Sequence, residues 1–408
     1  MPTIAKTMKI HIHTDKHADA EFRKLTSAYS YACNLISDYI FNHNFETGFM
    51  KLQEKIYHKI RNESGLKSQL TISALKTVSA KYKTVKEQLI QNSYKYRTKD
   101  GRTICIRKDL SWLEKPVHFS RPQADLVRSR DYSFIDNKKK ISVNTLGKRV
   151  KVTFDMPENF ACYFNEGWSF GTAKLVSLKN KWYLHIPITK DIPDSFSPES
   201  PSHIVGIDRG LRFIAVSYDE KGNCSFFNGK DILQKRSKFM KVRKELQSKG
   251  TKSSKRRLKA LSGRENRWMT DVNHQLSKAL ADRYGSNTLF VIEDLSGISF
   301  RGGSMSSRNK KQHREISSWS FYQLEQFLMY KAKEKGSFVL KVPATYTSQR
   351  CPKCGRIHKN NRRHKTHEYV CDVCGYRSND DRVGAMNLYV LGTLFVSGNE
   401  NPYFRKCA

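Results

Sequence analysis

Four cysteines in the C-terminal part of the chain have the spacing of a metal site. Cys351 and Cys354 form one Cys-x-x-Cys pair, Cys371 and Cys374 form a second, and residues 355–370 separate the pairs. Each short turn can direct two thiolates at one point, and four thiolates suit tetrahedral zinc. The alternative is redox chemistry, which two paired motifs in a basic chain disfavour.

The turns of this cysteine motif carry further signals. Gly355 and Gly375 each follow the second cysteine of a pair, where a tight turn requires positive φ. A four-thiolate site is closed, so zinc is expected to be structural and not catalytic. His358, His364 and His367 are competing ligands in principle, but four cysteines already complete the coordination shell.

Three acids lie where carboxylates could do chemistry. Asp208 interrupts the apolar run "IVGIDRG", Glu293 interrupts "LFVIED", and Asp381 follows Asp380 in the first turn of an expected final helix. A buried carboxylate needs a partner or a cation. Convergence of three acids on two Mg²⁺ ions would give the usual device for cutting phosphodiesters. The alternative is that these acids are helix caps and salt-bridge partners of the many arginines.

Charge indicates a polyanionic partner. The 408 residues include 74 Lys and Arg against 38 Asp and Glu, a formal net charge of +36 that is spread over most of the chain. This favours a long nucleic acid, and the alternative is a generally basic, ribosome-like or membrane-surface protein. No apolar run is long enough to span a membrane and no apolar signal core is present, so we expect a cytoplasmic protein.

The remaining cysteines do not suggest a disulfide framework, because an odd total includes five scattered residues. We expect these five to be reduced: Cys33, Cys105, Cys162, Cys224 and Cys407.

The elements that must position these residues follow from periodicity. Residues 1–12 contain a strand, 16–97 are helical, 98–130 are irregular and basic, and strand-like alternation begins near 140. The Pro- and Ser-rich segment 192–202 indicates a domain boundary.

After the boundary the pattern predicts buried strands, two basic helices within 230–284, and a helix that opens with a capping box from Ser320 to Gln323. The basic, glycine-rich segment 297–313 is interpreted as a loop. The predicted strands are 204–208, 213–218, 224–227, 287–295 and 337–344.

Basic side chains near a helix start and around the cysteine motif are candidates for nucleic-acid contact, and the alternative is a solvated basic surface. They are Lys255, Arg256, Arg257, Arg350, Arg362 and Arg363.

Five motifs in order, "GIDRGLRFIAVS", "VIEDLSGI", "TSQRCPKCG", "CDVCG" and "SNDDRVGAMN", resemble the RuvC-type nuclease core of TnpB, the RNA-guided endonuclease encoded by insertion sequences. Compact type V CRISPR effectors are similar. The resemblance covers roughly residues 200–392, whereas the N-terminal third is similar only in layout.

The resemblance implies that Asp208, Glu293 and Asp381 are the catalytic, Mg²⁺-binding acids, with Mn²⁺ as a possible substitute. Asp380 is then a cap or a supporting neighbour. Arg209 stands where many relatives have an apolar residue and could add a phosphate contact. Gly384 also departs from the family pattern, but removes no ligand.

The resemblance also implies an α/β and α+β multidomain fold: a helical recognition lobe inserted in a wedge β-barrel, then an RNase H-like RuvC domain with an inserted zinc ribbon. The expected domains are 1–12 as the first wedge strand, 13–115 as the recognition domain, 116–198 as the wedge barrel, 199–345 as the RuvC core with the basic helical segment 230–284, 346–378 as the zinc ribbon, and 379–408 as the final RuvC helix and tail.

The function implied is RNA-guided cleavage of DNA next to a short flanking motif. The partners would be a guide RNA, derived from a transposon end or a CRISPR locus, double-stranded target DNA and their heteroduplex, bound by a monomer or a homodimer. The alternatives are a nuclease-inactive RNA-guided repressor, which would lose acids of the triad, and a transposase or recombinase that uses the same acids.

Overall fold

The computed structural model describes residues 3–98, 100–164, 167–193, 195–295, 320–363 and 366–406. The chain divides into two compact units, one of residues 5–191 and one of residues 192–408 with the first residues of the chain. The predicted loop 297–313, His364 and Cys407 lie outside the described residues. Among the described helices, none combines the length and apolar character that a membrane span requires.

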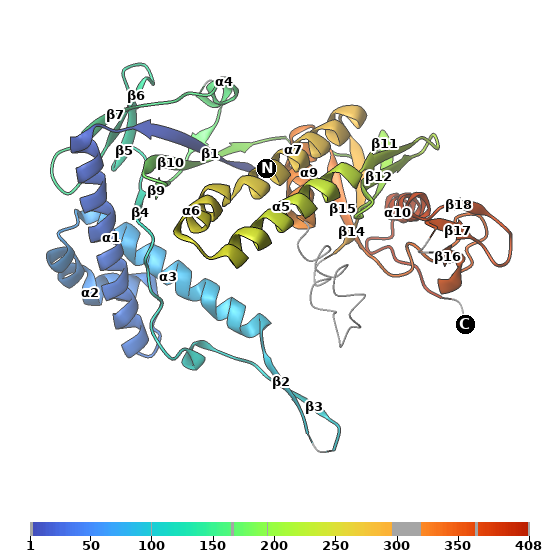
Figure 1. The fold of residues 1–408 in the computed structure, drawn as a ribbon, viewed down its shortest axis with the longest axis horizontal. Helices are drawn as coiled ribbons and strands as arrows, with labels where there is room; N and C mark the ends of the chain where they lie inside the picture. The colour runs from blue at the N-terminus through green and yellow to red at the C-terminus, as the bar shows by residue number, and fades with distance from the viewer. Residues whose placement is uncertain are drawn as a thin grey trace. The chain divides into compact units, whose positions relative to one another are not determined.

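The unit of residues 5–191 contains a curved eight-stranded sheet (Figure 1). Its order is β4-β9-β10-β1-β7-β6-β5, and β8 pairs with β10. The hydroxyl of Tyr132, on the edge strand β5, donates to the carbonyl of Gly171 beside β8 at 2.8 Å, so the sheet is nearly closed into a barrel. The strands are β1 (Thr3–His13), β4 (Gln123–Leu126), β5 (Tyr132–Ile135), β6 (Lys140–Val143), β7 (Val150–Phe154), β8 (Ser169–Phe170), β9 (Ala173–Leu178) and β10 (Lys181–Asp191).

Three helices lie between β1 and β4 in the chain, namely α1 (Lys16–Asn42), α2 (Phe49–Ser64) and α3 (Ser68–Gln91). Asp15 caps α1 by accepting from the amide of Ala18. The buried face of α1 joins the core of the sheet, where Phe22 contacts Trp182 edge to face. The predicted helical region is therefore confirmed as three helices, but it ends before the hairpin β2 (Tyr94–Arg97) and β3 (Thr103–Ile106).

The second unit is built on a five-stranded sheet of order β13-β12-β11-β14-β15. Strands β11 and β12 and strands β12 and β13 are antiparallel, whereas β11, β14 and β15 run parallel. Each of the five predicted strands is confirmed within a residue or two. Their bounds are β11 (His203–Asp208), β12 (Phe213–Asp219), β13 (Cys224–Asn228), β14 (Thr288–Asp294) and β15 (Phe338–Pro343).

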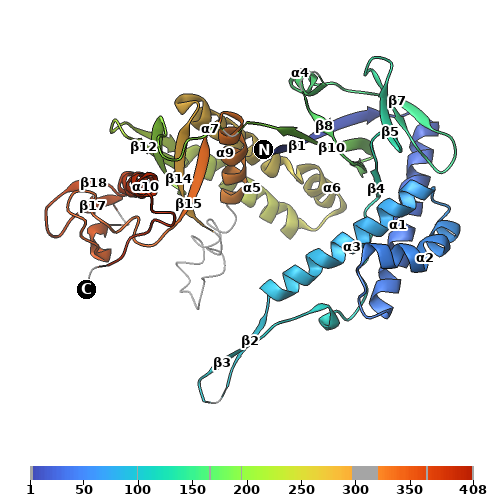
Figure 2. The same ribbon diagram turned by 180° about the vertical axis from the view of Figure 1, so that it is seen from behind.

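Helices cover both faces of this sheet (Figures 1 and 2). Val205, Ile207 and Phe290 point to one side, into a core shared with α7 and α9, whereas Leu289 and Val291 point to the other side, against α10. The sheet is therefore the middle of three layers. Both of its faces are covered, as the continuous apolar sequences of its parallel strands require. The helices of this unit are α5 (Lys230–Lys249), α6 (Lys252–Leu261), α7 (Arg264–Tyr284), α9 (Phe321–Glu334) and α10 (Asp380–Val396).

Two helix predictions in this unit were wrong in detail. The basic segment forms three helices and not two, with breaks at Gly250 and Gly263. Ser320 precedes α9 but makes no capping hydrogen bond from its side chain. Its hydroxyl accepts from the amide of Asn273 at 2.8 Å, so a contact with a distant helix replaces the cap.

Between β15 and α10 the chain forms a small ribbon that carries the four cysteines. Its three-stranded antiparallel sheet has the order β16-β17-β18 and leads directly into α10. The strands are β16 (Arg362–Arg363), β17 (Glu368–Val370) and β18 (Arg377–Asn379).

Candidate nuclease site and metal-binding ribbon

The sheet places two of the three predicted acids side by side. In the parallel pairing of β11 and β14, Ile207 is opposite Ile292, so Asp208 and Glu293 follow as neighbours at the carboxyl ends of the two strands. Both side chains keep part of their surface accessible. This edge is where open α/β sheets bind ligands.

Helix α10 brings the third acid to the same edge. It packs directly on β11, because Gly206 has no side chain: a Cβ there would lie 2.1 Å from the carbonyl oxygen of Ala385. One residue earlier on α10, a Cβ on Gly384 would lie 2.9 Å from Oδ2 of Asp208. Since Asp381 is three residues before Gly384, its carboxylate lies on the turn of α10 that faces Asp208.

The three carboxyl groups repel one another in a poorly solvated place. Burial raises the pKa of Asp208 well above its usual value, and Glu293 and Asp381 raise it further. Burial also raises the pKa of Glu293, against a lowering by the hydrogen bond from Thr347. For Asp381, burial and then Asp380 raise the pKa. A divalent cation would relieve this repulsion.

Asp380 has a different environment from its neighbour Asp381. It is 1% exposed, and Arg362 Nε of the ribbon donates to its Oδ2 at 2.9 Å. The same guanidinium lies 3.6 Å from Asp381 Oδ1. The backbone amide of Asp381 donates to Asp380 Oδ1 at 3.0 Å, and His367 Nδ1 lies 3.6 Å from that oxygen. Asp380 thus fixes the ribbon to the start of α10.

Sequence reasoning placed Arg362 among the candidate nucleic-acid contacts, but its guanidinium faces the acids. This place could not be read from the sequence, because β16 and α10 meet only in the folded ribbon. Its neighbour Arg363 is exposed and lies 3.9 Å from Glu368. Arg350 donates to Asn387 Oδ1 at 3.2 Å and stacks over the ring of Phe404.

Two polar side chains, Thr347 and Asn387, fix the chain around the acids, and neither contact was predicted from the sequence. The hydroxyl of Thr347 donates to Glu293 Oε1. The amide of Asn387, which is fully buried, donates to the carbonyls of Thr347 and Arg350 at 2.7 and 2.8 Å. The segment before the ribbon is therefore tied to both Glu293 and α10.

Arg209, a possible phosphate contact in the sequence, is buried and paired within the protein. It is only 7% exposed, and its guanidinium lies 3.3 Å from Glu325 of α9. It also donates to the backbone carbonyl of Glu293 through Nη2 at 2.5 Å. A buried arginine needs a paired carboxylate, and this pair fixes the strand end that carries Glu293.

The four predicted metal ligands converge. The sulfur atoms of Cys351, Cys354, Cys371 and Cys374 all lie within 4.8 Å of one another. The two turns have the same backbone hydrogen bonds: the glycine after each pair donates to the carbonyl of the first cysteine, at 2.9 and 3.2 Å. Both glycines have positive φ, 76° at Gly355 and 68° at Gly375.

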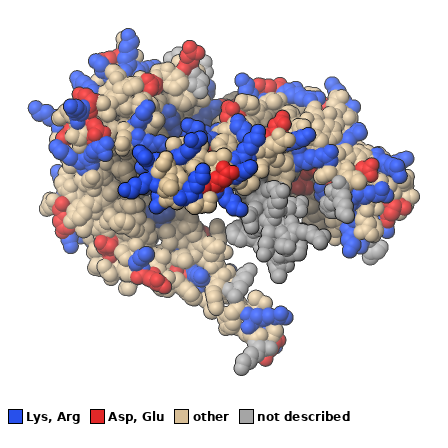
Figure 3. Space-filling view, viewed as in Figure 1, with Lys and Arg blue, Asp and Glu red and all other residues tan. Residues whose placement is uncertain are grey.

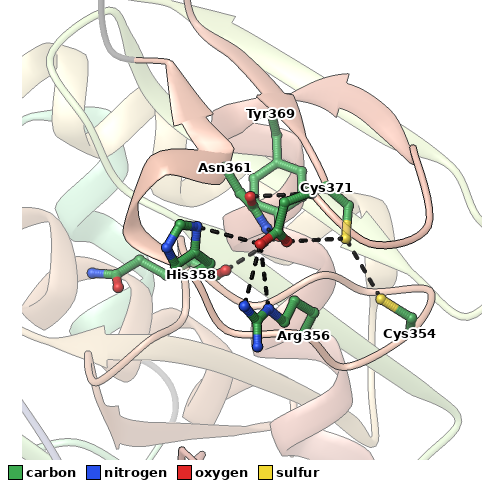
Figure 4. A network of polar contacts seen from close by, with 8 residues as sticks. Cys354, Arg356, His358, Asn361, Tyr369 and Cys371 are labelled. Carbon is green, nitrogen blue, oxygen red and sulfur yellow. Dashed lines mark hydrogen bonds and ion pairs between the residues drawn. The ribbon is translucent and has the colours of Figure 1, made fainter.

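A polar network supports this cluster (Figure 4). Asp372 accepts from Asn361 Nδ2 at 3.0 Å and from the guanidinium of Arg356 at 3.3 Å, and His358 Nδ1 lies 3.5 Å away. His358 therefore pairs with a carboxylate beside the cluster and is not among the converging ligands. The sulfur of Cys371 contacts both sides of this arrangement, since it lies 3.9 Å from Asp372 Oδ1 and 3.5 Å from the sulfur of Cys354.

The basic residues predicted on the helical segment are exposed. Lys255, Arg256 and Arg257 lie on one short helix, α6, and their side chains are solvent-accessible. Figure 3 shows Lys and Arg side chains gathered over α5 and α6. Such a surface has the electrostatic character of a site for a phosphate backbone.

Two protein families match parts of the chain. A family described as "Cas12f1-like, TNB domain" matches residues 321–388, and one described as "Probable transposase" matches residues 185–297. The first match contains the ribbon and Asp381, and the second contains Asp208 and Glu293.

The alignments with curated relatives cover about half of this chain. A "TnpB-like protein" of Methanocaldococcus jannaschii is 30% identical over 55% of this chain and 81% of its own length. The "CRISPR-associated endodeoxyribonuclease Cas12f1" of Syntrophomonas palmitatica is 28% identical over 52% of this chain and 44% of its own length. The "Putative RNA-guided DNA endonuclease InsQ" of Escherichia coli is 29% identical over 56% and 59%. The chain thus spans about half the length of the Cas12f1 relatives.

The fold is similar to a solved effector over nearly its whole length. A structure described as a "Cas12f1-sgRNA-target DNA complex" matches with a TM-score of 0.58 at 12% identity, covering 95% of this chain and 99% of that chain. The fold match and the identity to the Methanocaldococcus protein confirm the resemblance seen in the motifs. The chain belongs to the TnpB-like family and is a relative of the compact type V CRISPR effectors.

Proposed function

We propose that this protein is an RNA-guided DNA endonuclease. The observation that carries the proposal is the convergence of Asp208, Glu293 and Asp381, from two parallel strands and one helix, at a single accessible edge of the sheet. Relatives named as RNA-guided or CRISPR-associated DNA endonucleases support it.

We infer that the three acids hold divalent metal, in the form of two Mg²⁺ ions that Mn²⁺ can replace. Carboxylate oxygens are the hard ligands that Mg²⁺ prefers. The raised pKa values of the three acids fit a site completed by positive charge. When bound, the two ions would activate the attacking water and stabilise the leaving oxygen of a phosphodiester.

The surrounding residues prepare the acids for this role. Thr347 fixes one oxygen of Glu293, which leaves the other free to bind. Arg209 fixes the backbone at the same position. Arg362 forms an ion pair with the buried Asp380, so Asp381 is the member of the Asp-Asp sequence that remains for the metal.

We assign the sheet of residues 203–343 and helix α10 to an RNase H-like RuvC core. The strand order, with an antiparallel hairpin beside parallel strands and helices on both faces, supports this assignment. The barrel-like sheet and helices α1–α3 then correspond to the wedge and recognition modules, which the fold match supports.

We further propose that the ribbon binds one structural zinc ion through its four cysteines. Burial raises the pKa of the Cys351 thiol to about 12, so a thiolate there requires a cation. Four converging sulfur atoms and a supporting network leave no open coordination position, as in structural zinc sites.

The nucleic-acid partners of this proposal are a guide RNA, the target DNA and their heteroduplex. A net charge of +36 is tolerable when such a polyanion neutralises it. Base pairing would read the target sequence, and the protein would read helical shape and a short flanking motif.

The experiment is to express the chain with its native flanking DNA, sequence the RNA that copurifies, and add Mg²⁺ with a plasmid library carrying a guide-matched target beside random flanks. A defined RNA and cuts that disappear in Asp208→Ala support the proposal. A defined RNA with binding but no cuts indicates the repressor, against which the presence of all three acids argues. Guide-independent joining of transposon ends indicates the transposase that one matching family's description suggests.

A further inference from the structure

A second group of metal-type ligands lies on the barrel-like sheet of the unit formed by residues 5–191. His11 and His13 alternate on β1, so both rings project from the same face of the strand. Asp155 follows β7, and its amide donates to the carbonyl of His11 at 3.1 Å, so the two residues are direct neighbours across the strands.

The three side chains converge. His11 Nδ1 lies 2.9 Å from Asp155 Oδ2, and His13 Nε2 lies 2.6 Å from Asp155 Oδ1. One nitrogen of each ring and one carboxylate oxygen lie within 4.8 Å of one another. The hydrogen bonds from His13 and then His11 lower the pKa of Asp155, which keeps this carboxylate ionised and able to bind a cation.

We propose that His11, His13 and Asp155 form a binding site for one zinc-type divalent transition-metal ion. Two imidazole nitrogens and one carboxylate oxygen are ligands that Zn²⁺, Ni²⁺ and Cu²⁺ accept, whereas Mg²⁺ prefers oxygen alone. The side chain of His11 is 24% exposed, and those of His13 and Asp155 are 51% and 58% exposed. An ion can therefore enter from solvent, and water completes its coordination.

Metal binding would replace the two hydrogen bonds between the rings and Asp155 with bonds to the ion, while the strands keep their pairing. In the metal-free form, the carboxylate accepts a hydrogen bond from each ring, which orients the rings toward a common point. On binding, each neutral ring carries its hydrogen on the other ring nitrogen, so the nitrogen that faced Asp155 becomes a ligand, and the carboxylate binds the ion between the two rings. Because the ligands come from β1 and from the end of β7, the ion joins two strands that are far apart in sequence.

Among the described residues, two other groups of metal-type ligands lie close together. The cysteine cluster offers sulfur alone, and in the group of His367, Asp380 and Asp381 the carboxylate of Asp380 is already paired with Arg362. The proposal does not rest on the proposed nuclease function, since neither guide RNA nor cleavage enters its test.

The test is a zinc count on the full chain, produced without a polyhistidine tag. The protein is dialysed against buffered micromolar zinc with Mg²⁺ in large excess to occupy carboxylate sites, and bound zinc is measured by elemental analysis. The variants are His13→Gln and Asp155→Asn, and the matched control is His17→Gln, an exposed histidine on α1. Cys371→Ser identifies the zinc that belongs to the ribbon.

We expect His13→Gln and Asp155→Asn each to bind one zinc fewer than the wild type, and His17→Gln to bind the same number. The zinc affinity of the remaining site should fall by at least about tenfold per lost ligand. Zinc should also raise the Tm of the wild type more than that of His13→Gln, which checks that the variant is folded. An equal zinc count in the wild type, His13→Gln and Asp155→Asn would overturn the proposal and leave the group as an ion pair.

Discussion

Arg362 of the ribbon, which is partly exposed, and the buried Asp380 of α10 form an ion pair, with 2.9 Å between Nε and Oδ2. This pair supports the proposal that Asp381, and not its neighbour Asp380, is available to a metal ion. Asp380 is committed to the arginine, and Asp381 faces the strand that carries Asp208. The ribbon therefore has a second role besides the metal site proposed for it, because it fixes the start of the helix that carries Asp381.

Removing Arg362 should destabilise the protein strongly. Arg362→Met leaves Asp380 buried without its ion-pair partner, which typically costs about 3–5 kcal/mol of unfolding free energy. The matched control is Arg363→Met, since Arg363 is exposed and its change should stay within about 0.5 kcal/mol. Denaturant unfolding measures both. Equal stability of the two variants would contradict the structural role of the pair.

Replacing Gly206 should displace α10 from the sheet. A Cβ at this position meets backbone atoms of α10, the carbonyl of Ala385 and the amide of Tyr389, which cannot rotate away. Gly206→Ala should cost at least about 1–3 kcal/mol and reduce cleavage more than the loss of stability explains, because Asp381 moves with the helix.

The control for this change is Gly147→Ala, where the nearest atom to a new Cβ is 3.9 Å away. Thermal unfolding and Mg²⁺-dependent cleavage should be measured on both variants. If Gly206→Ala matches Gly147→Ala in both measurements, the close approach of β11 and α10 is not required.

The sequence predicted the strands that carry Asp208 and Glu293, because an acid that interrupts an apolar run marks the end of a buried strand. It also predicted the glycine turns of the cysteine pairs, since that geometry is local. It did not predict the contacts of Arg209 and Arg362, whose partners come from α9 and α10 and are brought near only by folding. Whether a basic residue faces solvent or a buried acid depends on tertiary packing.

Helix ends also depend on tertiary contacts that the sequence does not reveal. The breaks at Gly250 and Gly263 were not predicted. The predicted cap at Ser320 was wrong, because Asn273 of α7 provides a competing hydrogen bond. Local propensity decides such positions only where no distant side chain intervenes.

Neutralising Asp208 should stabilise the metal-free protein at neutral pH while abolishing cleavage. The folded-state pKa of Asp208 is raised, so ionising this carboxyl costs folding free energy. That cost is absent below the unfolded-chain pKa of about 3.9, grows as the pH rises from there to the folded-state value, and stays constant at higher pH. Metal-free Asp208→Asn should therefore have a higher Tm than the wild type at pH 7, and the difference should vanish toward pH 4.

Mg²⁺ should raise the Tm of the wild type but not that of Asp208→Asn, since only the wild type binds it well. The matched control is Asp282→Asn. Lys335 lowers the pKa of Asp282, so this substitution should remove a favourable interaction and give no increase in Tm. A metal-free Asp208→Asn that is less stable than the wild type at pH 7 would contradict the repulsion between the acids.

The exposed face of α6 should contribute to RNA binding through charge. Changing Lys255, Arg256 and Arg257 to Gln should weaken binding of the copurified RNA and reduce the salt dependence of the binding constant by about 0.7 per lost phosphate contact. Filter binding at several salt concentrations gives both quantities.

The control makes the same change of three charges on the exposed residues Lys51, Lys55 and Lys59 of α2. It separates local contact from net charge. Equal losses in the two triple variants would show that α6 acts only through the total charge of the protein.

The central claim is that Asp208, Glu293 and Asp381 are the metal-binding acids of an RNA-guided nuclease. Its most direct test is Mg²⁺-dependent cleavage of guide-matched DNA by the purified RNA complex, comparing Asp381→Asn with Asp380→Asn at a temperature where both are folded. Asp381→Asn should lose more than about 100-fold in cleavage rate while it still binds the target, whereas Asp380→Asn should lose less than about tenfold. Wild-type cleavage by Asp381→Asn would contradict the account.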